Sequence, residues 1–305
     1  MSLLDNSLSC GRRPAHLRVQ DAHHDDDSVE SDVFDFVQPE VKEPGDASSA
    51  SYQKDGLVGQ WDGIDNVIVG GQRMHSDTPD KWYDLSGNGY DGTFASPKTT
   101  LDWDDDGWRN TEKTTVPVTV PAAFSARIAN KVYTVEFLVE PSQGTTRFCY
   151  FSQWNGTKGF GLEQNASGQL RVGYFSALSP SRDWNSGTPS IPKDEVTHVA
   201  VTASNGVHVV YLNGVKAWTD TGDANLATGS DIPVAIGGEI ANRDKMAFLG
   251  KYYACRAYDR ALSADEVAEN YRVDDVRYVS GGSILLPLEL RNGELVATVP
   301  ASGSE

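Results

Sequence analysis

The sequence has few cysteines, no excess of positive charge and no long hydrophobic run. Its three cysteines, Cys10, Cys149 and Cys255, are odd in number and far apart, so they form neither a disulfide framework nor a metal-ligand pattern. Cys149 and Cys255 lie in apolar strand-like runs, where we expect two small buried residues. A bridge between these two is the alternative, and Cys10 is expected to be a free thiol.

The charge balance is strongly acidic, with a formal net charge of −17 and a sequence pI near 4.7. Nucleic acids and anionic membranes need a basic surface, so neither is expected as a partner. Divalent cations and neutral glycans stay compatible with this charge. The first residues lack a basic region followed by an apolar run, so we expect no conventional signal peptide and no ordinary export.

Residues 1–55 differ from the rest of the chain in composition. They hold an acidic tract and few apolar residues, apart from a short patch around Phe34 and Phe36. Such a segment buries too little apolar surface to offset the entropy of ordering it. We predict an acidic, flexible arm that assembles against another protein or a second copy of this chain through Phe34 and Phe36.

From Gly56 the chain consists of short apolar runs broken by glycine and other turn residues. Residues 132–139, 170–175, 197–202 and 207–212 alternate between apolar and polar positions, as strands with one buried face do. All-β sandwiches reach about 200–250 residues as one unit, so residues 56–280 are predicted to form a single domain of this class.

Three local signals add detail to this prediction. Asn213-Gly214 between two apolar runs predicts a tight β-hairpin. Ser263-Ala-Asp-Glu266 matches a capping box and predicts one helix that continues to about Arg272. Residues 281–305 contain two further apolar runs around Asn292-Gly293 and predict a C-terminal hairpin. A two-stranded hairpin is too small to be stable alone, so we expect it to dock on the sandwich or on another subunit.

Several stretches keep the order and spacing of a known family. They are Gly56-Leu-Val-Gly-Gln-Trp-Asp-Gly63, Trp82-Tyr-Asp-Leu-Ser-Gly-Asn-Gly-Tyr-Asp-Gly92, Thr197-His-Val-Ala-Val-Thr202, Val210-Tyr-Leu-Asn-Gly214, Ile236-Gly-Gly238, Phe248-Leu-Gly250, Tyr258-Asp-Arg-Ala-Leu-Ser-Ala-Asp-Glu-Val267 and Asn270-Tyr271. Together they resemble the laminin-G-like part of the concanavalin A-like lectin/glucanase superfamily. One departure is Val196-Thr197, where the family usually has an aromatic residue. The resemblance implies an all-β jelly-roll sandwich of two antiparallel sheets with one short helix near the C-terminus.

Members of this family are adhesins, glycan-binding modules attached to enzymes, and appendage domains, some of them on phage particles. Glycoside hydrolysis, the enzymatic use of the fold, needs two carboxylates roughly 5–10 Å apart. The strand with acidic residues at alternating positions that lectin-fold glucanases carry is missing here. The nearest pair, Glu136 and Glu140, lies four residues apart and is interpreted as an outward strand charge and a loop charge. We expect no enzyme.

Two acidic turns are weighed as calcium sites. Asp102, Asp104 and Asp106 alternate before a glycine, like the first half of a calcium loop, but Lys113 stands where the bidentate glutamate belongs. The turn with Asp84, Asn88 and Asp91 has glycines and side chains that bond nearby backbone amides. A solvated turn and a turn lock are the main interpretations; no cofactor is required, and structural calcium stays an alternative.

Tryptophans provide the candidates for a sugar platform. Trp61, Trp82 and Trp218 fall at family-like positions and are assigned to core or hairpin packing. The other four lie in polar loops and are the candidates for a glycan platform, with a ring that caps the edge of the sandwich as the alternative for each: Trp154, Trp184, Trp103 and Trp108.

The sequence thus predicts a non-catalytic structural or adhesion protein. The missing signal peptide, the acidic arm and the C-terminal hairpin favour a virion component, such as a phage capsid decoration, fibre or tail protein, that displays a lectin-like domain. Its partners would be other virion or surface proteins and a cell-surface glycan, on the virion surface or outside the cell. A bacterial carbohydrate-binding or adhesin module of a cell-surface protein is the alternative, and a glycoside hydrolase a more remote one.

Overall fold

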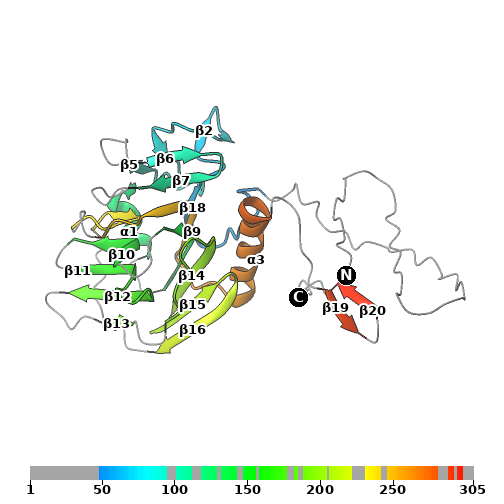
Figure 1. Cartoon of the computed structure of the whole chain (residues 1–305). Helices are drawn as coiled ribbons and strands as arrows, with labels where there is room; N and C mark the ends of the chain where they lie inside the picture. The colour runs from blue at the N-terminus through cyan, green and yellow to red at the C-terminus, as the bar shows by residue number, and fades with distance from the viewer. Residues whose placement is uncertain are drawn as a thin grey trace, which may run out of the picture. The chain divides into compact units, whose positions relative to one another are not determined.

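The computed structural model places the ordered strands in a β-sandwich (Figure 1). It describes residues 48–94, 101–111, 118–128, 132–142, 147–155, 158–176, 182–184, 188–204, 206–221, 231–241, 246–280, 288–291 and 294–297. Among these residues no helix is long and apolar enough to cross a membrane.

Sheet I is antiparallel and eight-stranded. Its order is β16 (Val215–Thr221), β15 (Val207–Leu212), β14 (Thr197–Ser204), β9 (Tyr133–Pro141), β18 (Gly250–Tyr258), β7 (Gly107–Asn110) and β6 (Leu101–Asp104), and β1 (Leu57–Asp62) also pairs with β18. The hairpin predicted at Asn213-Gly214 joins β15 to β16. Both residues have positive φ, +48° and +74°, which is the backbone that a two-residue hairpin turn requires.

Sheet II is also antiparallel and eight-stranded. Its order is β13 (Arg182–Trp184), β12 (Leu170–Ser176), β11 (Lys158–Gln164), β10 (Phe148–Trp154), β17 (Val234–Ile236), β8 (Val118–Val120), β5 (Gly92–Phe94) and β4 (Lys81–Trp82). Two small sheets complete the set: β2 (Val67–Val69) with β3 (Gln72–Met74), and β19 (Leu288–Arg291) with β20 (Glu294–Ala297). The last pair lies within residues 281–305, where the sequence predicts a C-terminal hairpin.

The core lies between the two sheets and is rich in aromatic rings. Trp108 stacks on Tyr252, with ring centroids 5.0 Å apart, and Phe137 stacks on Tyr150 at 4.9 Å. Alternate residues of β9 face this core, which is why the strand shows a period of two in the sequence. The short helix α1 (Ala122–Ile128) adds Phe124 to the same cluster. Cys149 and Cys255 are both buried and free, as expected.

Helix α3 (Ala264–Asp274) covers the outer face of sheet I beside β14, β15 and β16 (Figure 1). The predicted capping box is present: Ser263 Oγ accepts from the Glu266 amide at 3.2 Å, and the Glu266 carboxylate accepts from the Ser263 amide at 2.8 Å. The helix runs two residues further than predicted and continues into a π-helical turn, η3 (Asp275–Val279).

A buried ionic network fixes α3 to sheet I. The Arg256 guanidinium donates two hydrogen bonds to Asp274 of the helix, at 2.9 and 2.6 Å, and its Nε donates to Glu136 at 3.0 Å. All three side chains are at most 1% exposed. Two carboxylates and one guanidinium leave one unbalanced negative charge in a site with little water. Burial accordingly raises the pKa of Glu136 to about 7.

The sandwich begins earlier than Gly56. Ser49 and Tyr52 are buried, the Tyr52 hydroxyl donates to Asp274 at 2.7 Å, and the Gln53 amide donates to Asn270 at 2.9 Å. Residues 48–55, which composition alone includes in the arm, therefore pack on the sandwich. Phe34 and Phe36 lie outside the described residues.

Candidate functional site

The four tryptophans predicted as sugar platforms lie in different environments. For Trp108 the prediction is wrong. Its side chain is fully buried and lies between Trp82 and Tyr252 in the core. The hairpin of β6 and β7 forms the edge of sheet I, and pairing with β18 turns Trp108 inward. Trp103 on the other strand of this hairpin is half-buried and packs against the same core through Trp82 and Phe94. Neither ring is an open platform.

Trp154 is the platform candidate that the structure places best. It is the last residue of β10 and is half-buried. Its neighbour Gln153 points inward, because the Gln153 amide reaches the Ser125 carbonyl of α1 at 3.5 Å. Alternation along the strand then puts Trp154 on the outer face of sheet II. Its cross-strand partner is Gly159.

Trp184 ends the edge strand β13. The register of this strand pairs Trp184 with Val172 and Asp183 with Gly173. The side chain of Trp184 lies outside the described part of the structure, so its role as a platform stays a prediction.

The outer face of sheet II carries a band of small residues next to Trp154. The strand register aligns these residues in one row: Thr93, Thr119, Ala235, Ser152, Gly161 and Gly173. Paired residues project to the same face of a sheet, and their neighbours Leu162 and Val172 point into the core. Thr93 is exposed and Thr119 is half-buried, whereas Ala235, Ser152, Gly161 and Gly173 are buried, so only one end of the row reaches the surface.

A charged cluster lies on the far side of the small-residue band. Glu163, only 3% exposed, accepts hydrogen bonds from Arg147 at 3.0 and 3.1 Å and from Arg171 at 2.7 Å. Glu163 is four residues from Gly159 along β11, so it shares the face of Trp154 at a distance of about 13 Å. The Arg147 side chain is 51% exposed, and a guanidinium has more donors than this one carboxylate uses.

This cluster escaped the sequence interpretation because its members are 16 and 8 residues apart. Only the register of β10, β11 and β12 brings them together. No local motif marks the charges, although an acidic residue on an otherwise apolar strand was a usable signal.

The turn of Asp84, Asn88 and Asp91 is a backbone lock. The buried Asp84 carboxylate accepts the amides of Gln60, Ser86 and Tyr90 at 2.9–3.0 Å. Asn88 donates to the Val58 carbonyl, and Asp91 pairs with Lys81 while accepting the Asp84 amide. Because these oxygens already have protein partners, the turn lock explains the motif without an ion.

The turn of Asp102, Asp104 and Asp106 joins β6 to β7. Lys251 of β18 contacts the carboxylates of both Asp104 and Asp106, the first at 2.7 Å. One ammonium thus balances part of the charge that a calcium ion would balance. Asp102 is exposed on β6, two residues before Asp104 and opposite Arg109 in the strand register.

Glu136 and Glu140 of β9 have different partners and different burial. Glu136 lies on the outer face of sheet I, as interpreted, but α3 covers it and it is fully buried, which the local pattern did not indicate. Glu140 belongs to strand β9, so its interpretation as a loop charge is wrong. Glu140 contacts Arg109 at 3.3 Å and the Tyr253 hydroxyl at 3.0 Å. Four residues of strand separate the two carboxylates by about 13 Å, more than a glycosidase pair spans.

Known structures share this sandwich. The chain is similar to domain 4 of AbnA, a GH43 extracellular arabinanase from Geobacillus stearothermophilus in complex with arabinotriose, with 21% identity and a TM-score of 0.54. The match covers 72% of this chain and 100% of that domain.

Two larger proteins contain a similar unit. Trypanosoma rangeli sialidase in complex with 2,3-difluorosialic acid matches with 17% identity and a TM-score of 0.51, over 72% of this chain and 33% of the sialidase. The binding domain of Paraclostridial Mosquitocidal Protein 1 matches with 17% identity and a TM-score of 0.52, over 72% of this chain and 52% of that one. At these identities the likeness concerns the fold.

Family membership rests on a separate match. No curated protein matches the chain. The model of the Concanavalin A-like lectin/glucanases superfamily matches residues 112–268, which include the central strands of both sheets. The chain therefore belongs to the concanavalin A-like lectin/glucanase superfamily.

Proposed function

We propose that this protein is a non-catalytic carbohydrate-binding protein whose sugar-binding surface is the outer face of sheet II around Trp154. The observation that carries the proposal is that two surface side chains share this one face. Trp154 supplies an aromatic ring beside Gly159, and Arg147 supplies a half-exposed guanidinium with donors that Glu163 does not use.

The chemistry of sugars fits this arrangement. A sugar ring has an apolar face, which stacks on an aromatic ring, and a rim of hydroxyls, which need donors and acceptors at fixed positions. The Glu163 carboxylate holds the guanidinium groups of Arg147 and Arg171 in place, so their orientation is set before a ligand arrives. A separation of about 13 Å between the ring and the charges suits an oligosaccharide better than a single sugar.

The fold supports the same proposal. The arabinanase domain that this chain resembles was solved with arabinotriose, so arabino-oligosaccharides are a reasonable first probe. Glu136 and Glu140, the nearest pair of carboxylates on β9, lie too far apart for a glycosidase pair, which supports binding without hydrolysis.

The test compares two half-buried tryptophans. Binding of the full chain to a glycan array that includes arabinotriose and sialylated glycans is measured for wild type, Trp154→Ala and Trp218→Ala. Trp218 lies on the edge strand of sheet I and packs against the core, so it is a matched control. We expect only Trp154→Ala to weaken binding, by about tenfold or more, which corresponds to roughly 1.4 kcal/mol. Equal binding by both variants would exclude Trp154 from the surface.

We further propose that residues 1–47 and the hairpin at 281–305 are assembly elements of a virion or cell-surface protein. Tyr52 and Gln53 are hydrogen-bonded to residues of α3, and the acidic tract precedes them in the sequence. The test is the assembly state of full-length Phe34→Ser/Phe36→Ser by analytical ultracentrifugation. Loss of assembly supports the proposal, and unchanged assembly overturns it. A trimmed control chain must begin by residue 48, because Tyr52 belongs to the fold.

A further inference from the structure

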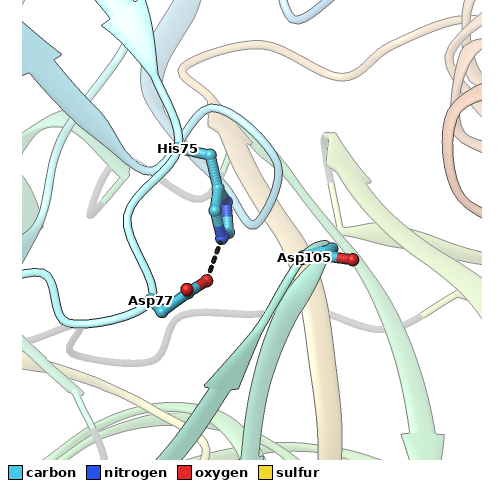
Figure 2. A group of neighbouring side chains, drawn as sticks. All are labelled: His75, Asp77 and Asp105. Carbon is cyan, nitrogen blue, oxygen red and sulfur yellow. Dashed lines mark hydrogen bonds and ion pairs between the residues drawn. The ribbon is translucent and has the colours of Figure 1, made fainter.

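A small group of metal-ligating side chains lies apart from the face of Trp154. His75 and Asp77 follow strand β3, and Asp105 is at the tip of the neighbouring hairpin between β6 and β7 (Figure 2). One ligand atom of each residue lies within 4.8 Å of the others. Nothing in the sequence links them, since Asp105 is the acidic residue of its turn that alternation leaves out.

The orientation of His75 is fixed by the backbone. Its Nδ1 lies 3.1 Å from the Gly63 carbonyl and 3.0 Å from the Ile64 carbonyl. Carbonyl oxygens only accept, so Nδ1 carries the hydrogen and Nε2 of the neutral ring has the free lone pair. A histidine held in this way by a main-chain carbonyl is the usual arrangement of a metal ligand.

The charges at the group call for a cation. Nε2 of His75 faces Asp77 Oδ1 at 3.0 Å, and two acceptors this close repel unless a proton or a metal ion lies between them (Figure 2). A proton on His75 balances one carboxylate, whereas Asp77 and Asp105 together carry two charges. A divalent cation balances both.

Both loops are held in place by groups outside the cluster. The buried Asn66 side chain bonds the amide and the carbonyl of Ser76, between His75 and Asp77, at 2.8 Å each. On the hairpin, Lys251 contacts Asp104 and Asp106 on either side of Asp105. Lys251 therefore balances the two flanking carboxylates and leaves Asp105 as the charge directed to a different partner.

We propose that His75, Asp77 and Asp105 bind one divalent transition metal ion, of which Zn²⁺ is the favoured occupant. One imidazole and two carboxylates are ligands that Zn²⁺ takes, whereas Ca²⁺ prefers six to eight oxygen ligands. The ion fastens the loop after β3 to the β6–β7 hairpin, with water completing its coordination. Calcium, weighed for this turn from Asp102, Asp104 and Asp106, is not its occupant.

The test is Zn²⁺ binding by isothermal titration calorimetry, with the melting temperature as a second readout. The full chain carries His23→Ala/His24→Ala, because adjacent histidines beside Asp25 can bind Zn²⁺ by themselves. Variants His75→Ala and Asp105→Asn are compared with Asp102→Asn, which removes an exposed carboxylate from the same hairpin and serves as control.

We expect one site, a higher melting temperature with Zn²⁺, and weaker binding at acidic pH, where a proton displaces the metal from imidazole. Each ligand variant should lose more than the roughly 10- to 100-fold that loss of a supporting contact costs, while Asp102→Asn keeps wild-type affinity. Unchanged affinity in His75→Ala or Asp105→Asn overturns the proposal. A Ca²⁺ response equal to that of Zn²⁺ overturns the choice of metal.

Discussion

The outer faces of the two sheets both carry charged residues, but they use them differently. On sheet I, Arg256, Glu136 and Asp274 are at most 1% exposed and are covered by α3. On sheet II, Glu163 is equally buried at 3% but its partner Arg147 is 51% exposed. A charge with all its bonds inside the protein holds the fold together, while one with free donors at the surface can also hold a ligand.

The outer face of sheet I is closed to ligands, whereas that of sheet II is not covered by α3. A helix closes the face of sheet I, so no ligand reaches its charges without displacing α3. On the outer face of sheet II, the cross-strand partner of Trp154 is Gly159. The family fold is thus used asymmetrically, with one face for internal cohesion and the other for binding as proposed above.

The largest expected effect breaks the charge network of sheet I. Arg256→Met leaves Glu136 and Asp274 buried without their cation, which should lower the free energy of unfolding by about 3–5 kcal/mol. Arg171→Met is the matched change on sheet II and should cost about 1.5–3 kcal/mol, because Arg147 still pairs with Glu163. Urea unfolding of both variants measures the difference; equal losses would remove the distinction between the faces.

A second prediction concerns pH. Burial raises the pKa of Glu136 to about 7 and lowers the pKa of His198, its buried neighbour at 3.8 Å, to about 4. Between about pH 4.5 and 6.5 the unfolded chain carries this proton on histidine and the folded chain carries it on Glu136. The number of bound protons is then equal in both states, so this pair contributes no slope to stability in that window.

Variants that remove one of the two groups should each show a pH dependence of the free energy of unfolding, with opposite signs. Relative to wild type, Glu136→Gln should gain stability as pH rises from 4.5 to 6.5, because only the unfolded state then binds a proton, on His198. His198→Gln should lose stability over the same range, because only the folded state binds one, on Glu136. Each slope approaches about 1.4 kcal/mol per pH unit. Parallel curves for the two variants in urea unfolding would contradict the assignment.

A third prediction tests whether residues 48–55 belong to the sandwich. Tyr52→Phe removes the hydroxyl that donates to Asp274 at 2.7 Å and keeps the ring over Arg256. We expect a loss of about 2 kcal/mol, typical of a hydrogen bond to a charged group. The control is Tyr83→Phe, which changes a half-buried tyrosine directly after β4 of sheet II and should leave the free energy of unfolding near that of wild type. A loss no larger than that control places Tyr52 outside the fold.

The smallest effect concerns the start of α3. Ser263→Ala removes the capping oxygen for the Glu266 amide and should lower stability by about 1 kcal/mol. Glu266 also pairs with Arg260 at 2.6 Å, so the helix start keeps one anchor in the variant. Thermal unfolding monitored by circular dichroism measures this loss of stability. Glycan binding is a second readout and should not change. A change in sugar affinity would mean that α3 and the face of sheet II are coupled.

The local sequence pattern was sufficient to predict a structural feature wherever the contacts that form it are between residues close in sequence. The period of two in β9, the turn at Asn213-Gly214 and the capping box at Ser263 each depend on a few neighbouring residues, and each appears as predicted. Trp108 could not be placed in this way. Its neighbours in the sequence are typical of a loop, but it lies in an edge hairpin. The pairing of this hairpin with β18, more than 140 residues later in the chain, turns the ring inward.

By itself the sequence determined the fold class, because alternation, turn residues and caps are local consequences of backbone geometry and side-chain shape. The tertiary structure decided which charges meet. Glu163 finds Arg147 and Arg171 through strand register, Glu136 lies under a helix formed more than 120 residues later, and His75 lies near Asp105 across two loops. These encounters depend on long-range packing of the sheets, and a single sequence read in order contains no local record of them.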